Sequence, residues 1–345
     1  MTRATAGDRV GPLVVAEMSG NHNGSLERAL EIVRAAAAAG AHAVKIQTYT
    51  ADTITLDVDT PAFRVGDGHA LWGSQRLYDL YEEAHTPWDW HRPIFELAHE
   101  FGLLAFSTPF DESAVDFLEE LEVPLYKIAS LEIVDTPLIR YVAQTGKPVI
   151  LSVGTATLAE VAAAVDAARS GGCTDLTLLA CTSSYPARPD DANLRRIPAM
   201  AELFGVDVGL SDHTPGVGVS IAATALGATV IEKHFTLSRA DGGVDAAFSL
   251  EPSELRELVE GCDAAARALG AASVWTTPAE SESRRLRPSL YVAQDVAPGD
   301  IVTLGNVRSV RPAGGLPPAE IDRVLGKTFR TSAAKGTPLS WDIIG

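Results

Sequence analysis

Short apolar runs alternate with segments of helical periodicity through most of the chain. Strand-like runs occupy residues 13–17, 43–47, 103–107, 124–128, 148–152, 175–180, 206–210 and 229–233. Helical patterns occupy residues 25–39, 87–101, 112–122, 136–145, 158–170, 192–204, 217–226 and 252–269. Eight strand–helix units in about 260 residues match the number and size of a (β/α)8 TIM barrel of the α/β class. A doubly wound open sheet is the alternative, but it rarely contains eight regular units of this length.

Two segments depart from this alternation. Residues 48–86 separate the second strand from its helix and contain Trp72, Tyr78 and Tyr81, so a lid or hairpin packed over the top of the barrel is expected. Residues 280–287 form a charged linker after a first domain of residues 1–279. Residues 288–345 then predict a small β-rich domain, with strands at 289–293, 301–304 and 307–310 and a short helix near 318–325.

Composition restricts the possible partners and location. The chain has 345 residues, 46% of them hydrophobic, and a net charge of −17, which argues against nucleic acid or an anionic membrane as a partner. No segment approaches the length of a membrane span. The three cysteines, Cys173, Cys181 and Cys262, lack CxxC spacing, so we expect reduced thiols in a cytoplasmic protein.

Polar residues collect where the predicted strands end, which is where TIM barrels place their active sites. Lysines interrupt the second and fourth strands, and each could instead be a structural side chain that reaches solvent. The shared position of so many polar groups favours a site. The strand-end residues are Glu17, Lys45, Gln47, Thr108, Lys127, Ser130, Ser152, the run Thr182-Ser-Ser-Tyr185, His213 and His234.

The residue types indicate a chemistry. His213 and His234 end consecutive predicted strands, 21 residues apart, so their imidazoles can share one divalent ion that keeps open coordination positions. Lys45 and Lys127 can hold a phosphorylated acid, and Glu17 can act as an acid/base group. The set suits a reaction between a phosphate-bearing carboxylic acid and an aldehyde or ketone.

These motifs resemble the sialic acid synthase family over nearly the whole chain. The matching segments are Ala16-Glu-Met-Ser-Gly-Asn-His-Asn-Gly24, Val44-Lys-Ile-Gln-Thr48, Phe106-Ser-Thr-Pro-Phe110, Tyr126-Lys-Ile-Ala-Ser130, Leu210-Ser-Asp-His213 and Val230-Ile-Glu-Lys-His234. Within the family, Glu17-Met-Ser-Gly20 and Thr182-Ser-Ser-Tyr-Pro186 are most similar to the pseudaminic acid synthases. The part after Arg287 resembles the antifreeze-like (SAF) domain of these enzymes.

The resemblance implies a transferase that condenses phosphoenolpyruvate with a 2,4-diacetamido-2,4,6-trideoxy hexose. The products would be a nine-carbon 2-keto acid and phosphate, released by C–O cleavage. Manganese is the expected ion, with magnesium or cobalt as alternatives, and a domain-swapped homodimer is the expected assembly. The implied roles are catalysis for Glu17, metal binding for His213 and His234, phosphoenolpyruvate binding for Lys45, Lys127, Thr108, Ser130 and Ser152, lining of the sugar and metal pocket for Gln47, Tyr185, Ser211 and Asp245, and insertion into the partner's active site for Arg311.

Other functions stay open at this point. N-acetylneuraminate and legionaminic acid synthases are close alternatives, although Ser183 stands where neuraminate enzymes usually carry a substrate-binding asparagine. A lysine inside a barrel strand is also found in Schiff-base aldolases. A non-catalytic surface- or carbohydrate-binding protein would not need this set of ionisable residues.

Overall fold

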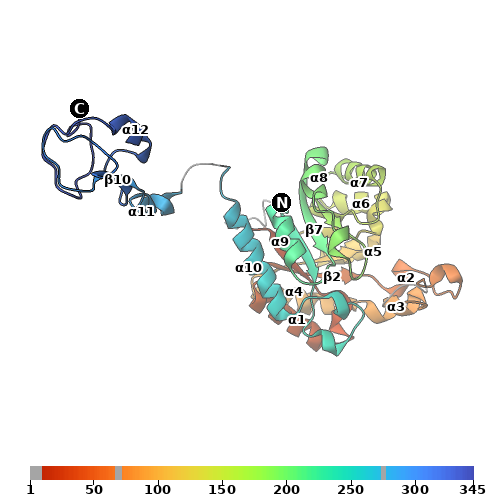
Figure 1. Cartoon of the computed structure of the whole chain (residues 1–345). Helices are drawn as coiled ribbons and strands as arrows, with labels where there is room; N and C mark the ends of the chain where they lie inside the picture. Colours follow the sequence, from red (N-terminus) through yellow and green to blue (C-terminus); the bar gives the residue numbers. More distant parts are fainter. Residues whose placement is uncertain (1–9, 67–71, 273–276) are drawn as a thin grey trace. The chain divides into compact units, whose positions relative to one another are not determined.

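The computed structural model describes residues 10–66, 72–272 and 277–345. Contacts divide the chain into two compact units, Met1–Gly270 and Ala271–Gly345, so the division falls ahead of the expected linker at 280–287. The first unit confirms the predicted (β/α)8 barrel, because its eight strands are all parallel and close into a ring in sequence order (Figure 1). Its strands are β1 (Leu13–Glu17), β2 (Ala43–Thr48), β3 (Leu104–Pro109), β4 (Tyr126–Ile128), β5 (Val149–Ser152), β6 (Leu176–Cys181), β7 (Asp207–Asp212) and β8 (Val230–His234).

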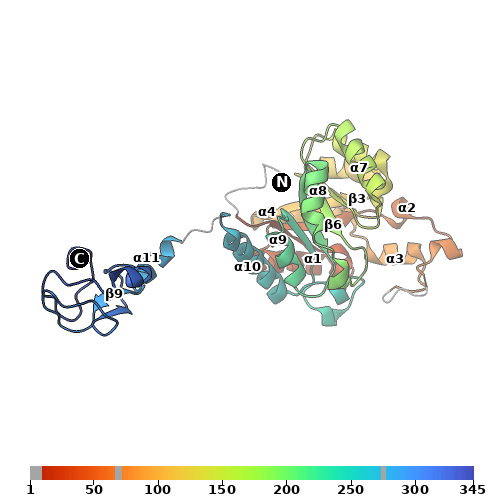
Figure 2. The same cartoon turned by 45° about the horizontal axis from the view of Figure 1, so that its top comes forward.

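Helices surround these strands in both views of the molecule (Figures 1 and 2). The helix starts follow local capping: Ser25 accepts a hydrogen bond from the Arg28 amide, and Thr157 forms a capping box with Glu160. The predicted helix 87–101 is shorter than expected, because a 3-10 turn at Trp88–Trp90 precedes it. The barrel helices are α1 (Leu26–Ala39), α4 (His91–Glu100), α5 (Glu112–Glu120), α6 (Thr136–Gln144), α7 (Leu158–Ser170), α8 (Arg196–Phe204), α9 (Gly218–Ala225) and α10 (Pro252–Leu269).

The interior of the barrel is apolar at the amino ends of the strands and polar at their carboxyl ends. Alternate residues of a strand face the same side, so Leu13 and Val15 share the inner face with Glu17. The inner apolar cluster contains Leu13, Val15, Ala43, Phe106, Leu125, Ile150, Leu179 and Val230. Gly209, on β7, lies beside this layer. A side chain would not fit there, because a Cβ would overlap the carbonyl oxygen of Val230. A packed floor therefore supports the polar groups at the mouth of the barrel.

The long insertion at 48–86 packs against loops at the carboxyl ends of the strands, as its aromatic residues predict. It carries the short helices α2 (Ala51–Ile54) and α3 (Leu77–Ala84), and Arg64 and Arg76 form a single antiparallel bridge. The indole Nε1 of Trp72 donates a hydrogen bond of 2.9 Å to the carbonyl oxygen of Val244, in the loop after β8. Figures 1 and 2 show α2 and α3 at the edge of the barrel.

The second unit is small and has its own core. Strands β9 (Ser289–Val292) and β10 (Val307–Val310) pair antiparallel, and Leu290, Val307, Phe329 and Leu339 are among its buried residues. The predicted strand at 301–304 is wrong, because Ile301 forms only one isolated bridge, to Thr328. Helix α11 (Ser281–Arg284) lies within the expected linker, and α12 (Ile321–Val324) lies in the expected short helix.

Candidate active site

A small polar chamber of about 60 Å³ lies at the carboxyl ends of the barrel strands. Eleven of the fourteen side chains expected to form the site line it, so the structure brings together residues that are up to 217 positions apart. The lining residues are Glu17, Lys45, Gln47, Thr108, Lys127, Ala129, Ser130, Ser152, Cys181, Tyr185, Ser211, His213, Glu232 and His234.

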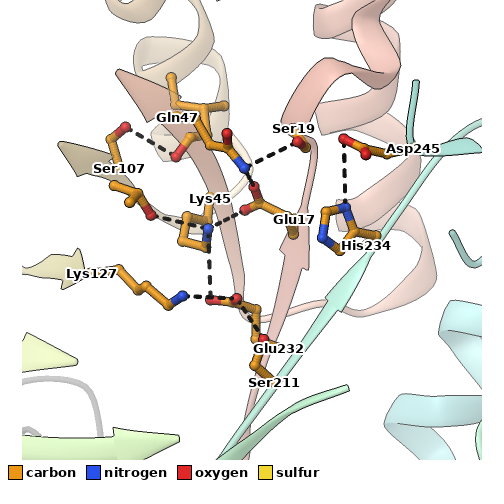
Figure 3. Close-up of polar contacts among 12 residues, drawn as sticks. Glu17, Ser19, Lys45, Gln47, Ser107, Lys127, Ser211, Glu232, His234 and Asp245 are labelled. Carbon is orange, nitrogen blue, oxygen red and sulfur yellow. Dashed lines mark hydrogen bonds and ion pairs between the residues drawn. The ribbon is translucent and has the colours of Figure 1, made fainter. Parts of the chain in front are cut away.

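Two lysines and two glutamates form a buried network in this chamber. Lys45 Nζ lies 2.6 Å from Glu17 Oε2 and 3.8 Å from Glu232 Oε2, and Lys127 Nζ lies 3.5 Å from Glu232 Oε1. Figure 3 shows Lys45 between the two carboxylates. All four side chains are at most 6% exposed, so their charges interact without much screening by water. With both carboxylates ionised, the four charges sum to zero.

The two glutamates differ in their affinity for protons. Burial raises the pKa of Glu17, and this effect exceeds the opposing attraction of Lys45. Burial also acts to raise the pKa of Glu232, but Lys127 and Lys45 together outweigh it and the pKa is lowered. For Lys45, burial opposes the charge, yet Glu17 and Glu232 raise the pKa of the ammonium group. Glu17 is therefore the carboxyl suited to hold and release a proton.

Neutral polar groups complete the small chamber. Gln47 Nε2 donates to Glu17 Oε1 at 3.0 Å, and Lys45 Nζ donates to Thr108 Oγ1 at 3.2 Å. Ser211 Oγ donates to Glu232 Oε1 at 3.1 Å. Ser152 Oγ is buried and has no hydrogen-bond partner within the described part of the chain. A buried hydroxyl without a partner is costly unless a ligand supplies one, so Ser152 is available to a bound anion.

The two histidines lie next to each other, as a shared ion requires. Their ring centroids are 5.3 Å apart, and His213 Nδ1 lies 3.1 Å from the carbonyl oxygen of Thr182. Because only a protonated Nδ1 can donate to that carbonyl, Nε2 of a neutral His213 carries the lone pair. Burial, together with His213 and Lys45, lowers the pKa of His234 well below its usual value. His234 is therefore a neutral potential ligand.

The donor set fits a metal ion that keeps open coordination positions. His234 Nδ1 has no hydrogen-bond partner among residues 10–66, 72–272 and 277–345, and Asp245 Oδ2 lies 4.0 Å from it. Over the same residues, no group of three or more histidine, cysteine, aspartate or glutamate side chains is arranged to hold a metal ion. Two imidazoles alone would leave several positions for substrate oxygens or water.

Cys181 contacts one of these histidines. Its Sγ lies 3.9 Å from His213 Nδ1 and 3.8 Å from Ser183 Oγ. Burial opposes charge on both the thiol and the imidazole, but their mutual contact outweighs it, so the pKa of Cys181 is lowered and the pKa of His213 is raised. All three cysteines are free and buried.

A larger chamber of about 370 Å³ adjoins the small one. Gln47, Ala129, Ser130, Tyr185 and His234 line both chambers. The larger one also contains the predicted residues Ser183 and Asp245, together with Ser19, Glu132 and Thr155. Its wall is mostly apolar and is formed by Tyr49, Ile54, Val65, Trp72, Leu77, Leu80, Tyr81, Ala84, Phe110, Leu131 and Val244. The insertion at 48–86 supplies most of this wall.

Aromatic rings pack against both imidazoles. The Tyr185 ring lies 4.4 Å from the His213 ring and 5.9 Å from the Trp72 ring, measured between centroids. Phe248 packs against His234 at 4.9 Å. These contacts keep both imidazoles in an apolar surrounding, which strengthens any electrostatic interaction they make.

The residues that line the site but were not predicted from the sequence include Glu232, Cys181 and Glu132. Glu232 lies two residues before His234, so strand alternation places it on the same face. Cys181 is the last residue of β6, between the predicted strand 175–180 and the predicted polar run that begins at Thr182. Glu132 lies in a short 3-10 turn and burial raises its pKa to about 7, which no sequence pattern indicates. Arg311 is exposed in the second unit, just after β10, and its predicted role in a partner's site stays a prediction.

Comparison with known proteins agrees with this geometry. Residues 32–273 match the NeuB family, and residues 287–344 match the SAF domain. The chain belongs to the NeuB family. The SAF match also agrees with the antifreeze-like domain expected after the barrel.

Relatives of this NeuB family chain cover almost all of its length. It is 42% identical over 334 residues to a pseudaminic acid synthase of Helicobacter pylori, covering 96% of this chain and 98% of the relative. It is 35% identical to an N,N'-diacetyllegionaminic acid synthase of Legionella pneumophila, covering 96% and 94%. The structure of N-acetylneuraminic acid synthetase from Leptospira borgpetersenii, in complex with citrate, has a TM-score of 0.70 and 32% identity, covering 79% of this chain and 90% of that one.

None of the helices within the described residues combines the length and hydrophobicity that crossing a lipid bilayer requires.

Proposed function

We propose that this protein condenses phosphoenolpyruvate with a 2,4-diacetamido-2,4,6-trideoxy hexose to give a nine-carbon 2-keto acid and phosphate. The observation that carries the proposal is the small chamber, where two buried ammonium groups lie beside a pair of imidazoles and an acid/base carboxyl. The 42% identity to pseudaminic acid synthases over nearly the whole chain supports the choice of sugar.

The two chambers suit the two substrates. Lys45 and Lys127 can hold the phosphate and carboxylate of phosphoenolpyruvate, and the hydroxyls of the same chamber can donate to their oxygens. The larger chamber has a mostly apolar wall, which favours a deoxygenated, acylated sugar over one that is hydroxylated at every carbon. Because the chambers share Ser130, Tyr185 and His234, the reacting carbons of both substrates would meet at these residues.

The reaction balances with water as the third reactant. C3 of phosphoenolpyruvate bonds to the aldehyde carbon of the open-chain sugar, whose oxygen takes up a proton. Water adds at C2 and loses a proton, and the C2–O bond breaks so that phosphate leaves with the bridging oxygen. Glu17 holds and releases a proton in this sequence, because its raised pKa keeps the carboxyl protonated closer to neutral pH.

A divalent ion, Mn²⁺ or alternatively Mg²⁺ or Co²⁺, would be held by His213 and His234 and would supply Lewis-acid polarisation of the sugar's aldehyde. The lysines meanwhile stabilise negative charge on the departing phosphate from a site nearly closed to water. Gln47 contributes by holding Glu17 toward the chamber through its 3.0 Å hydrogen bond.

Phosphate release tests the proposal directly. The purified protein, phosphoenolpyruvate and Mn²⁺ are incubated with the diacetamido-trideoxy sugar or with N-acetylmannosamine, and inorganic phosphate is measured. We expect release with the first sugar, and in ¹⁸O-water we expect the label in the keto acid and none in phosphate. Release with N-acetylmannosamine alone would overturn the choice of sugar in favour of an N-acetylneuraminate synthase, and labelled phosphate would overturn C–O cleavage.

The alternative of a legionaminic acid synthase is supported by the 35% identity of this chain to the Legionella pneumophila enzyme. The same phosphate-release assay with the sugar of that enzyme decides between the pseudaminic and legionaminic acid synthase activities. A Schiff-base aldolase has less support. Its lysine must be neutral to attack a carbonyl, whereas Lys45 is held as a cation by Glu17 and Glu232. Borohydride trapping of substrate on Lys45 or Lys127, with activity that survives a chelator, would reverse this preference.

We also propose that the enzyme acts in the cytoplasm as a domain-swapped homodimer in which Arg311 enters the partner's active site. This rests on the family resemblance, and the free, buried cysteines agree with a reducing compartment. Mixing inactive Arg311→Ala and Lys127→Met subunits would restore activity if Arg311 acts in trans. If mixtures stay inactive after subunit exchange, Arg311 does not act across subunits.

A further inference from the structure

Strands β7 and β8 end in side-chain pairs that alternate between the inside and the outside of the barrel. Ser211 lies opposite Glu232 in the chamber, and the next register pair is Asp212 with Lys233. Asp212 and Lys233 face the helices, since neighbouring strand residues point to opposite sides. The ladder between these strands ends at this pair, one residue before each histidine. Backbone pairing between β7 and β8 therefore stops just short of the imidazoles.

A cluster of buried polar side chains connects the two strands where their backbone pairing ends. Lys233 Nζ lies 2.9 Å from Asp212 Oδ2, and these side chains are 0% and 2% exposed. Ser220 Oγ, on α9, donates to Asp212 Oδ2 at 2.6 Å. The backbone amide and hydroxyl of Thr214 donate to Asp212 Oδ1 at 2.9 and 2.8 Å, and Lys233 donates to the Thr214 carbonyl oxygen. We call Asp212, Thr214, Ser220 and Lys233 the clamp.

The clamp fixes the backbone on both sides of His213. Asp212 precedes this histidine, Thr214 follows it, and both are bonded to Lys233, which directly precedes His234. A shift of either strand end would break several of these contacts together. The separation of the two imidazoles is thus tied to a set of charged hydrogen bonds outside the chamber.

Stability is a weak explanation for such a pair. Replacing a buried ion pair with apolar residues of similar volume is often neutral or stabilising, because removing two charges from water is costly. The best-supported use of buried ionic groups is to specify one register over others. Contacts that fix the register of β7 and β8 matter most at this point, because His213 and His234 come from different strands and must reach the same ion.

We propose that the clamp positions His213 and His234 for metal binding, with Asp212 and Lys233 as positioning residues. The inference rests on the metal site of the proposed function. Residues that hold metal ligands in place typically change metal affinity 10- to 100-fold when replaced, although they never touch the ion. None of the clamp side chains lines the small chamber, so we expect their replacement to leave phosphoenolpyruvate binding unchanged.

The test measures Mn²⁺ alone, from the loss of the free-ion electron paramagnetic resonance signal. The double variant Asp212→Leu/Lys233→Met removes the pair without leaving a lone buried charge, and Ser220→Ala removes one hydrogen bond. We expect the Mn²⁺ dissociation constant to rise about tenfold or more in the double variant and severalfold in Ser220→Ala. Phosphoenolpyruvate affinity without metal, measured by calorimetry, should stay within twofold.

The matched control is Val165→Ala, a buried position on α7 that also loses stability by leaving a cavity. It should bind Mn²⁺ like the wild type. Clamp variants that fold and bind Mn²⁺ like the wild type overturn the proposal, and if the double variant does not fold, Ser220→Ala decides alone. A wild-type protein that binds no Mn²⁺ would instead overturn the metal site itself, and the clamp's role with it.

Discussion

Lys45 and Lys127 bring the same charge into the small chamber but make different contacts, so replacing each with methionine separates anion binding from stability. Lys45 is the partner of Glu17 at 2.6 Å and also lies 3.8 Å from Glu232. Among the charged groups of the described residues, Lys127 contacts only Glu232, at 3.5 Å. Glu232 keeps Lys45 and Ser211 as partners when Lys127 is lost, whereas Glu17 has no second cation partner in the part of the chain that the structure describes.

The magnitudes follow from these contacts. Removing one partner of a buried ion pair costs about 3–5 kcal/mol of unfolding free energy, which we expect for Lys45→Met. Protonation of Glu17 limits this cost, because its pKa is already raised by burial. Lys127→Met should lower the free energy of unfolding by only about 1 kcal/mol, because Glu232 keeps its other partners. Each variant loses a charged hydrogen bond to the bound anion, which contributes about 1.5–3 kcal/mol of binding free energy. The dissociation constant for phosphoenolpyruvate should therefore rise roughly 10- to 150-fold.

Urea unfolding at pH 8 and at pH 6, with calorimetric titration of phosphoenolpyruvate in the absence of metal, measures both effects. A carboxyl whose pKa is raised in the folded state binds more protons when folded, so the stability of Lys45→Met should recover as the pH falls. A Lys45→Met protein as stable as the wild type at pH 8 would show that the Glu17 pair is not significant. Unchanged phosphoenolpyruvate affinity in Lys127→Met would remove Lys127 from the anion site.

Three further outcomes are expected. Burial lowers the pKa of His91 from 6.5 to about 4, so the unfolded chain binds a proton that the folded one does not as pH falls from 6.5 to 4. His91→Gln should therefore reduce the slope of unfolding free energy against pH between 7 and 5, and an unchanged slope would contradict this. Ser183→Asn should raise kcat/KM for N-acetylmannosamine relative to kcat/KM for the diacetamido-trideoxy sugar. If the ratio of these two values stays constant, Ser183 does not determine the choice of sugar. Trp72→Ala loses the hydrogen bond to Val244 and should raise the KM of the sugar several-fold while phosphoenolpyruvate affinity, measured by calorimetry, stays the same.

The barrel and its site were predictable from the sequence to different degrees. The positions of all eight strands follow from apolar runs, and strand-end polarity identifies Lys45, Lys127 and both histidines. Glu232 was not predicted because only the final histidine of β8 was considered, whereas the inner face of that strand also includes the residue two positions earlier. Counting back from His234 would have found it.

Other features depend on contacts between segments that no local pattern encodes. The larger chamber exists because the insertion at 48–86 places Trp72 beside Tyr185, which comes from the loop after β6. The pKa of Glu132, which also lines this chamber, is raised by burial in the folded chain. The strand expected at 301–304 has β-prone residues but only a single bridge, because a turn at residues 304–306 follows at once, with the Val307 amide donating to the Thr303 carbonyl oxygen.

The balanced charges of the small chamber have a consequence for ligand uptake. Phosphoenolpyruvate carries up to three negative charges, and the free site offers no net positive charge to match them when Glu17 and Glu232 are both ionised. Taking up a proton on Glu17, the carboxyl with the raised pKa, would reduce this mismatch. Anion uptake is then linked to proton uptake, so the measured heat of association should depend on the ionisation enthalpy of the buffer, and affinity should increase toward acidic pH until the ligand's own phosphate becomes protonated.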